Sequence, residues 1–397
     1  MLFNLRKRYL HRKALRLNRW PGIAAAVTAA IIVGGCGSSE NNTSDRASAD
    51  GSAGVEHAKA QIARFSQVPE FTFDGAPFDA SKAKGKTVFN IPSSSQIPFL
   101  QVIDKTMAKI AKSYGINFIQ YANSGQPSEW AKGIDTAIAR KVDAITLEGG
   151  PYPMVLQPQL KRAKAAGIPV LLLHNWPNNK PDPPNVDVNV TVDFELAGRL
   201  MADAAIAESN GKANVLVLDS EDLVPADPVL VSGIKDELAK HCPDCKVTVK
   251  NVGPVSEWST KPKSVVQSAL IENPATDWII AVFDALSLPA SAGVRAAGKG
   301  SQVKIATYNG SPFALKMIQE NDIIHTEIGE SLDWLAHSYM DQTMRVLTGT
   351  PPAEDERAPF RVFNPSNISD AGTPPEDSVG YGDAYLKGYR DIWAGKQ

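Results

Sequence analysis

The stretch KTVFNIPSSSQIPFLQVIDKTMAKIAKSYG, from Lys86 to Gly115, decides the fold of the chain. It begins as a short apolar run, breaks at the polar residues 93–96, and resumes with apolar residues at helical spacing. Steps of four and three place these later side chains on one face of a helix that follows a buried strand. The helix face consists of Phe99, Ile103, Met107, Ile110 and Tyr114. Strand, polar break and helix form a unit that is repeated along the chain.

Short apolar runs alternate with helical segments as far as residue 328. This alternation is typical of parallel sheets that are covered by helices on both faces. So many strands exceed one convenient sheet, and we therefore expect an α/β protein with two lobes, each a doubly wound parallel sheet. The expected strands are Thr87–Ile91, Asn117–Tyr121, Ala144–Leu147, Pro169–Leu173, Asn214–Leu218, Lys246–Val249, Trp278–Val282, Lys304–Thr307 and His325–Ile328.

The N-terminus carries the features of an export signal. Residues 1–20 contain seven basic residues and no acid, and Pro21 to Val33 is an uncharged run. This run is shorter than the roughly 18 apolar residues that a membrane-spanning helix needs. Val33-Gly34-Gly35-Cys36 resembles the lipobox of bacterial lipoprotein signal peptides, which implies cleavage before Cys36 and a lipid on its sulfur. The alternative is an ordinary secretory signal with an incidental cysteine.

The residues after Cys36 fit a tether outside the cytoplasm. Gly37 to Gly54 has almost no large apolar side chain, so we expect residues 36–85 to form a flexible tether with a short helix at Val55 to Phe65. Without the seven basic residues of the signal, 34 basic residues face 43 acidic ones. This balance argues against a nucleic-acid-binding surface, which would be basic.

Two cysteines remain, Cys242 and Cys245, in the sequence HCPDC. Outside the cytoplasm two nearby thiols usually pair, so a local disulfide is expected. Free thiols and metal or redox chemistry are the alternatives. A structural zinc site needs four ligands, and only His241 is close in the sequence.

Signatures of catalysis are missing from the sequence. No G-x-G-x-x-G follows the first strand, and the chain contains no G-x-x-x-x-G-K-[ST], G-x-S-x-G or H-E-x-x-H. We therefore expect a protein that is not an enzyme and that uses no cofactor and no metal.

Polar and aromatic residues follow nearly every expected strand. In open parallel sheets ligands bind beyond the carboxyl ends of the strands, and a few placed polar groups beside flat apolar faces form a site for a small polar ligand. Helix capping explains Ser93 equally well, but it explains Trp176 and Glu330 poorly, because neither residue type favours an N-cap. The residues expected to bind ligand on this ground are Ser93, Ser94, Gln96, Phe99, His174, Asn175, Trp176, Asp284, Asn309 and Glu330.

Five segments, in this order, resemble the type I periplasmic binding proteins of the ribose/galactose class, which feed ABC importers. The resemblance runs from about Lys86 to Ser366. Its segments are Ile97-Pro98-Phe99 before a long helix, RKVDAITLEG (140–149), AAGIPVLLLHN (165–175), DWIIAVFDALSLPASAGVRAAG (277–298) and KIATYNGSPFALKMI (304–318).

The resemblance implies two similar lobes joined by a three-strand hinge, with the ligand clamped between them. The first lobe would comprise residues 86–191 and 331–358, and the second residues 192–330 and 359–373, followed by a helical extension at 374–397. The partners would be a sugar or polyol and a membrane permease, and the protein would be a monomer. Position by position, the resemblance adds Leu100, Leu230, Trp258 and Leu286 to the site.

Three of the departures from the family pattern alter the expected chemistry of the site. Leu230 stands where the family has an arginine and Leu286 where it has an asparagine, while His174-Asn175 replaces an Asp-Arg pair. A carboxylate or phosphate ligand would need Arg or Lys in the cleft, so a neutral polyol or a cation held by aromatic faces fits better. A ligand sensor and a hydrolase that uses Asp284 and Glu330 as a carboxylate pair are the remaining alternatives.

Overall fold

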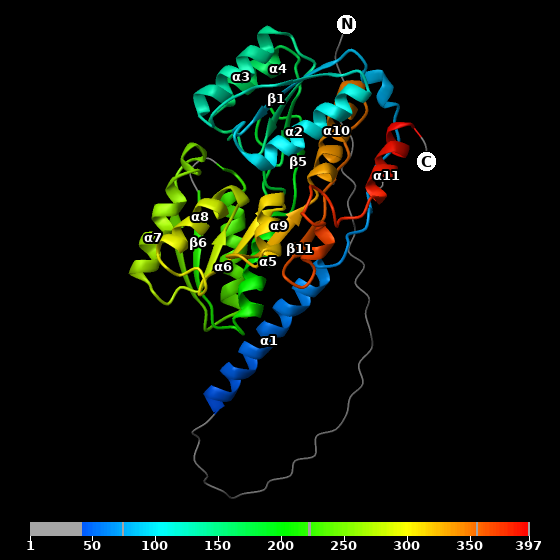
Figure 1. Ribbon diagram of the computed structural model, residues 1–397. Coiled ribbons are helices and arrows are strands. Elements are labelled where there is room, and N and C mark those ends of the chain that lie inside the picture. Colours follow the sequence, from blue (N-terminus) through cyan, green and yellow to red (C-terminus); the bar gives the residue numbers. More distant parts are fainter. Residues whose placement is uncertain (1–41, 74, 221–223, 355, 396–397) are drawn as a thin grey trace, which may run out of the picture. The chain divides into compact units, whose positions relative to one another are not determined.

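The computed structural model describes residues 42–73, 75–220, 224–354 and 356–395. The described residues form two β-sheets with helices on both faces of each (Figure 1). The strands of the first sheet are β1 (Thr87–Pro92), β2 (Asn117–Gln120), β3 (Ala144–Glu148), β4 (Val170–Leu173) and β5 (Val188–Val190). The strands of the second are β6 (Asn214–Asp219), β7 (Lys246–Asn251), β8 (Trp278–Ala281), β9 (Lys304–Asn309), β10 (Ile324–Glu330) and β11 (Phe360–Phe363).

Both sheets use the same strand order. The first runs β2-β1-β3-β4-β5 and is parallel throughout, and the second runs β7-β6-β8-β9-β10 with β11 added antiparallel to β10. In each sheet the order reverses beside the first strand, so that β1 meets β3 and β6 meets β8. Ligands of doubly wound sheets bind at such switch points, beyond the carboxyl ends of the strands.

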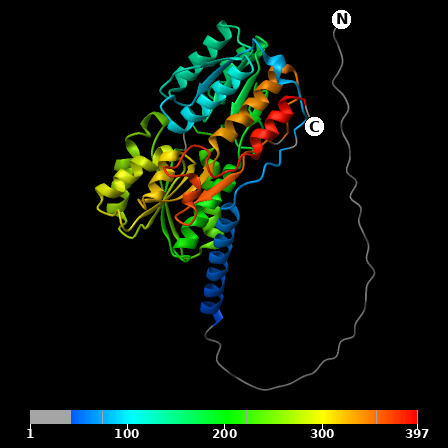
Figure 2. The ribbon, with the colours of Figure 1, turned by 45° about the vertical axis from the view of Figure 1, so that its right-hand side comes forward.

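The helices cover the sheets as the alternating pattern predicts. Val88 and Phe89, neighbours on β1, belong to separate apolar clusters on opposite faces of the first sheet. A strand that is buried on both faces has this pattern, because successive side chains point to opposite sides. Figures 1 and 2 show the helices in layers around both sheets. The helices are α1 (Asn42–Phe65), α2 (Pro98–Ser113), α3 (Pro127–Ala139), α4 (Gln157–Ala165), α5 (Phe194–Glu208), α6 (Asp227–His241), α7 (Lys261–Glu272), α8 (Asp284–Ala296), α9 (Pro312–Gln319), α10 (Leu332–Thr348) and α11 (Ala384–Trp393), with short 3₁₀ turns at Ala80–Ala83, Val255–Glu257 and Ile368–Ala371.

The chain passes between the two sheets three times. It leaves the first sheet after β5, returns from β10 into α10, which packs on α2, and crosses again from α10 to β11. The expected two-lobed fold with a three-strand hinge is therefore confirmed. The lobe boundaries given above stay a prediction.

Each expected strand is present within two residues of its expected ends, and two strands were not expected. The first, β5, has only three residues, too few to show a periodic pattern. The second, β11, has the sequence FRVF, in which Arg361 interrupts the apolar run. The guanidinium of Arg361 is nevertheless buried, because it bonds the Ser66 carbonyl and the carboxylate of Asp370.

The segment before the first sheet differs from the expected tether. The helix α1 begins at Asn42, thirteen residues before the expected start at Val55. Alanine, a strong helix former, recurs through its first half, and this outweighs the lack of large apolar residues. The expected signal peptide and the lipid-carrying Cys36 lie outside the described residues. Among the residues that are described, no helix combines the length and apolarity needed to cross a membrane.

Two further expectations concern the second sheet and the C-terminus. Cys242 and Cys245 form a disulfide just after α6. The expected helical extension contains α11, which packs on α10: the indole of Trp393 donates a hydrogen bond to Asp341 and stacks on His337.

Candidate functional site

A small cavity lies where the carboxyl ends of both sheets meet. Residues that follow β3 and β4 and the start of α2 border it from the first sheet, and residues that follow β6, β8 and β9 border it from the second. Its lining consists of Ile97, Pro98, Phe99, Leu100, Gly149, His174, Val224, Ala226, Trp258, Phe283, Ala285, Asn309, Ser311 and Phe313. Both topological switch points thus contribute to one cavity.

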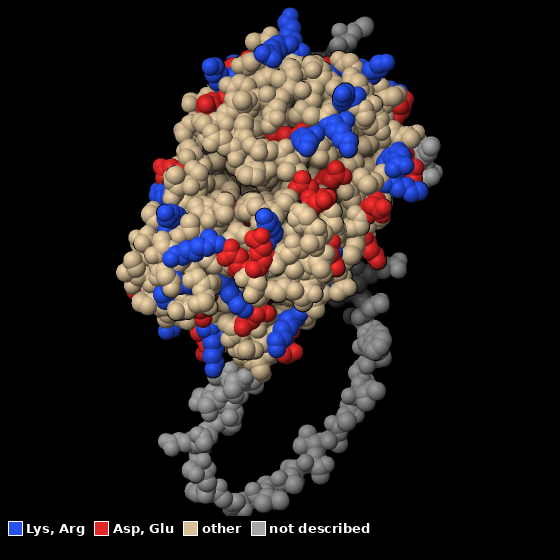
Figure 3. Space-filling view, in the orientation of Figure 1, with Lys and Arg blue, Asp and Glu red and all other residues tan. Residues whose placement is uncertain are grey.

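The cavity is narrow and has few ionisable side chains. Its volume of about 30 Å³ leaves room for about two water molecules. The described lining residues include one histidine, His174, and no Lys, Arg, Asp or Glu. Figure 3 shows a crevice across this face of the molecule that is bordered mostly by uncharged surface. A solute larger than two water molecules can therefore enter only if the lobes move apart.

His174 is held by a buried network that joins the two lobes. Its Nε2 atom is 3.0 Å from Glu330 Oε2 and 2.9 Å from the Tyr308 hydroxyl, which donates to Glu330 Oε1 at 2.8 Å. A carboxylate only accepts hydrogen bonds, so the His174 tautomer with hydrogen on Nε2 is the one that fits this contact. Burial, together with the charge of Glu330, raises the pKa of Tyr308 well above its usual range and keeps the hydroxyl a donor. The ring of Phe99 lies 5.2 Å from that of His174.

Two of the polar lining residues stand in unusual backbone conformations. His174 has φ = 50° and Asn309 has φ = 139°. A residue with a side chain rarely adopts such angles, and they persist where the surrounding structure enforces them, often at functional sites. The amide nitrogen of the Asn309 side chain is buried and has no hydrogen-bond partner among the described residues. It can donate to a solute in the cavity.

Trp258 presents a fixed aromatic face from the second lobe. Its indole nitrogen donates to the Ser220 hydroxyl at 2.9 Å, and that hydroxyl donates to the Gly253 carbonyl at 2.6 Å. The ring of Phe283 stacks beside it with centroids 5.5 Å apart and planes 22° apart. Rings held in this way can pack against the C–H face of a solute.

The polar residues after β1 do not line the cavity. Ser93 and Ser94 are buried, and Gln96 is exposed. The carbonyl of Ser93 accepts a hydrogen bond from the Trp130 indole at 2.9 Å, and the hydroxyl of Ser94 accepts one from the Gln96 amide at 3.3 Å. This stretch shapes the turn into α2 and thereby positions Phe99.

Four other residues that were expected to bind ligand form hydrogen bonds with protein groups and are absent from the cavity lining, and their role in ligand binding stays a prediction. The Asn175 side chain donates to the Pro151 carbonyl at 2.9 Å, and the Trp176 indole donates to the Pro181 carbonyl at 3.0 Å. One oxygen of Asp284 accepts from the backbone of Ser311 at 2.8 Å, and burial raises the pKa of Asp284 to about 6. Both oxygens of Glu330 are engaged by His174 and Tyr308, so Glu330 supports the lining from behind.

The two leucines that replace polar residues of the resembled family are fully buried. Leu230 lies on α6 and Leu286 on α8, and neither belongs to the cavity lining. Both leucines belong to the apolar core, so neither position contributes a polar group to the cavity.

Several lining residues escaped the sequence-based prediction. Phe283 and Phe313 line the cavity and were not among the expected ligand residues. A signal was nevertheless present: Ser311-Pro312-Phe313 at the start of α9 repeats the pattern of Ile97-Pro98-Phe99 at the start of α2. Phe99 lines the cavity from the first lobe, and Phe313 lines it from the second.

Comparison with known proteins places the chain in a family. The family described as "Periplasmic binding protein domain" matches residues 88–350. The D-apiose import binding protein of Paraburkholderia graminis is 26% identical over 238 residues, which cover 59% of this chain and 72% of that protein.

Solved structures show the same fold. A solute-binding protein of an ABC transporter from Agrobacterium vitis with bound allitol has a TM-score of 0.65 at 20% identity, covering 73% of this chain and 99% of the other. One from Bacillus halodurans with bound myo-inositol has a TM-score of 0.64 at 18% identity, covering 74% and 99%. With the family match over most of the chain and two sheets that meet at one cavity, the chain belongs to the periplasmic binding protein family of ABC transporters.

Proposed function

We propose that the protein captures a small neutral solute of the sugar or polyol class between its lobes and delivers it to the permease of an ABC importer. The observation that carries this proposal is the neutral, ring-lined cavity at the carboxyl ends of both sheets. Neutral donors and acceptors suit hydroxyl groups, and the rings suit C–H faces. The relatives that are named for D-apiose, allitol and myo-inositol support this ligand class.

The proposal includes where the protein works. A lipid on Cys36 anchors a monomer to the outer side of the bacterial cell membrane, and the lobes close on the solute by the three-strand hinge. The basic, uncharged and small-residue segments at the N-terminus support the anchor. Cys36→Ser is expected to move the protein from the membrane fraction to the soluble fraction, and the fatty-acyl mass is expected to disappear from the N-terminal peptide. Retention of both would contradict the anchor.

A thermal-shift screen tests the ligand class. Protein purified in detergent is heated with D-apiose, allitol, myo-inositol, choline and gluconate in turn. A neutral compound that binds the native state is expected to raise the midpoint of thermal unfolding. At a hundred times its Kd, the ligand adds about 2.7 kcal/mol to the free energy of unfolding. Choline and gluconate are expected to leave the midpoint unchanged, because the described lining residues include no carboxylate, no Lys and no Arg.

The remaining outcomes separate the alternatives. A shift with choline alone would show that the rings hold a cation and would contradict the neutral-solute proposal. Release of a chromogenic aglycone from glycosides would show hydrolysis. Uptake of labelled ligand by cells with and without the gene distinguishes transport from sensing, since loss of uptake is expected only for a transport protein.

A further inference from the structure

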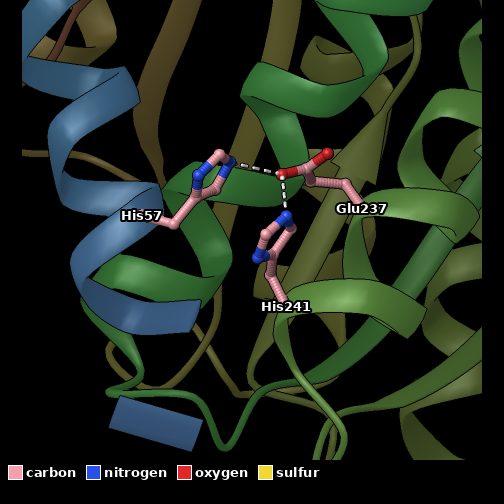
Figure 4. A group of neighbouring side chains, drawn as sticks. All are labelled: His57, Glu237 and His241. Atoms are coloured by element: carbon pink, nitrogen blue, oxygen red, sulfur yellow. Dashed lines mark hydrogen bonds and ion pairs between the residues drawn. The ribbon is translucent and has the colours of Figure 1, made fainter. Parts of the chain in front are cut away.

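A second cluster of chemically competent side chains lies away from the cavity, where α1 meets α6. His57 comes from α1, and Glu237 and His241 come from α6 (Figure 4). One ligand-type atom from each side chain lies within 4.8 Å of the others. Figure 4 shows the two imidazoles directed toward the same carboxylate oxygen, Glu237 Oε1.

The spacing of these atoms resembles a coordination sphere. His57 Nε2 is 2.9 Å and His241 Nε2 is 3.5 Å from Glu237 Oε1. Two ligand atoms that each lie about 2.1 Å from a tetrahedral zinc ion are themselves about 3.4 Å apart. The two Nε2–Oε1 distances are thus close to those between zinc ligands, but one ring must turn before both nitrogens can point at one ion.

The hydrogen bonding of His241 favours a cation bound among the three side chains. Its Nε2 atom is buried and forms no hydrogen bond to any described residue. His57 Nε2 is hydrogen-bonded to Glu237 Oε1 at 2.9 Å, whereas His241 Nε2 approaches the same oxygen only to 3.5 Å. A hydrogen-bonded pair of His57 and Glu237 would leave His241 unsatisfied, and an unpaired buried polar atom costs about 1–3 kcal/mol. A cation shared by both rings satisfies all three side chains.

The protein holds the carboxylate from behind. Asp203 of α5 forms a hydrogen bond with Glu237, and Arg199 Nε lies 4.0 Å from Glu237 Oε2, the oxygen that does not face the histidines. Outer groups of this kind orient metal-binding carboxylates. The Glu237 side chain is only 8% exposed, whereas that of His57 is 34% exposed, so an ion could enter from the α1 side.

The helix contact that brings His57 into place is tight. A Cβ atom at Gly54 would lie 1.9 Å from the carbonyl oxygen of His241, so only glycine allows α1 to approach the end of α6 so closely. Val55 and Ala58 of α1 are also buried. The disulfide between Cys242 and Cys245 closes the loop that directly follows His241.

We propose that His57, Glu237 and His241 form a binding site for a divalent transition-metal ion of the zinc class, which links α1 to the second lobe. Two imidazoles and one carboxylate are a donor set that zinc accepts, with water completing four ligands. The rings are stacked, with centroids 3.9 Å apart and planes 4° apart. Because a metal binds in the plane of the ring, loading rotates one imidazole about its Cβ–Cγ bond.

Metal titration of the protein purified in detergent and stripped with EDTA tests this site. Calorimetry is expected to show one Zn²⁺ per chain, and Co²⁺ is expected to give the visible absorption of a four-coordinate ion. His57→Ala and His241→Ala are each expected to weaken Zn²⁺ binding at least 100-fold. The matched control is His325→Ala, because His325 has a single carboxylate neighbour, Glu208 at 3.5 Å.

The results separate a site from a simple ion pair. Zn²⁺ binding that is absent, or that survives in both His57→Ala and His241→Ala, would overturn the proposal. Loss of binding in His325→Ala as well would show adventitious surface binding and would also overturn it. The Co²⁺ spectrum of the unchanged protein decides the question even if a variant fails to fold. Limited proteolysis gives an independent readout, since Zn²⁺ is expected to protect α1 from cleavage.

Discussion

Glu330 acts on the candidate ligand cavity without lining it. It is fully buried at the end of β10, and both of its oxygens are bonded by His174 and Tyr308. The network therefore fixes the orientation of His174, which does line the cavity. One residue from the first lobe and two from the second share a single set of hydrogen bonds, so the orientation of His174 depends on how the lobes sit together.

Removing the Tyr308 hydroxyl tests this network. Tyr308→Phe is expected to lower the free energy of unfolding by about 1–3 kcal/mol, because Glu330 Oε1 then remains buried without its donor. The matched control is Tyr381→Phe, since the Tyr381 hydroxyl is buried but has no hydrogen-bond partner among the described residues. Urea denaturation measures both variants. Equal losses in the two would show that the hydroxyl of Tyr308 contributes nothing specific.

The two tryptophans that the sequence pointed to are expected to behave differently. Trp258→Ala is expected to weaken ligand binding at least 10-fold, because it removes an aromatic face of the cavity. Trp176→Ala is expected to leave the affinity unchanged, because its ring packs beside Tyr152 and its nitrogen bonds the Pro181 carbonyl. Calorimetry with a ligand from the screen measures both. The reverse order of effects would mean that the ligand site lies elsewhere.

The sequence predicted some of the residues that line the cavity. Phe99, His174, Trp258 and Asn309 were expected and line the cavity. Of the three residues that follow β4, only His174 lines the cavity, while the side chains of Asn175 and Trp176 donate to the carbonyls of Pro151 and Pro181. The sequence shows that a polar group follows a strand, but only the three-dimensional turn shows which of three neighbours faces inward.

Strand–helix alternation was the strongest signal at the scale of elements. It located nine strands within two residues. Most of them are buried on both faces and are therefore continuous apolar runs, whereas β2 and β7 are partly exposed. The same rule misses β5 and β11, which are short edge strands at hinge crossings. Their pairing is set by where the chain returns to a sheet, which local composition does not encode.

A buried carboxyl pair links β3 and α2 beneath the first lobe's side of the cavity. Asp104 of α2 accepts a hydrogen bond from Asn90 at 2.5 Å, and Asn90 also donates to Glu148 of β3 at 2.8 Å. Burial raises the pKa of Asp104 to about 6 and that of Glu148 well above its usual range. The folded lobe therefore holds a proton that the unfolded chain releases above about pH 4.

The sign of the pH effect follows from these directions. A folded-state pKa raised above the unfolded value stabilises the protein at low pH, and that stability is lost as the pH rises from about 4 through about 6. Asp104→Asn is expected to flatten this decline in the free energy of unfolding, measured by denaturation at several pH values. Asp135→Asn, on the exposed face of α3, is the control and is expected to keep the wild-type slope. An unchanged slope in Asp104→Asn would contradict the assignment.

At the scale of the whole molecule the lobes meet too closely for a solute to enter without movement. A Cβ atom at Gly125 would lie 3.2 Å from Val255 Cγ1, and one at Gly150 would lie 3.7 Å from Val224 Cγ1. These contacts join the first sheet's loops to those of the second. Three separate crossings between the lobes allow them to part while the strand order within each sheet stays intact.

A wedge in the cavity is expected to hold the lobes apart. Ala226 lines the cavity just before α6 and is 3% exposed, and the cavity volume of about 30 Å³ cannot accept an indole without lobe separation. Ala226→Trp is therefore expected to lower ligand affinity at least 100-fold and to leave the radius of gyration from small-angle scattering unchanged on adding ligand. The unchanged protein is expected to contract. Ala139→Trp, exposed at the end of α3, is the size-matched control and is expected to contract normally. Contraction of Ala226→Trp with wild-type affinity would mean that the solute is not held where the two sheets meet.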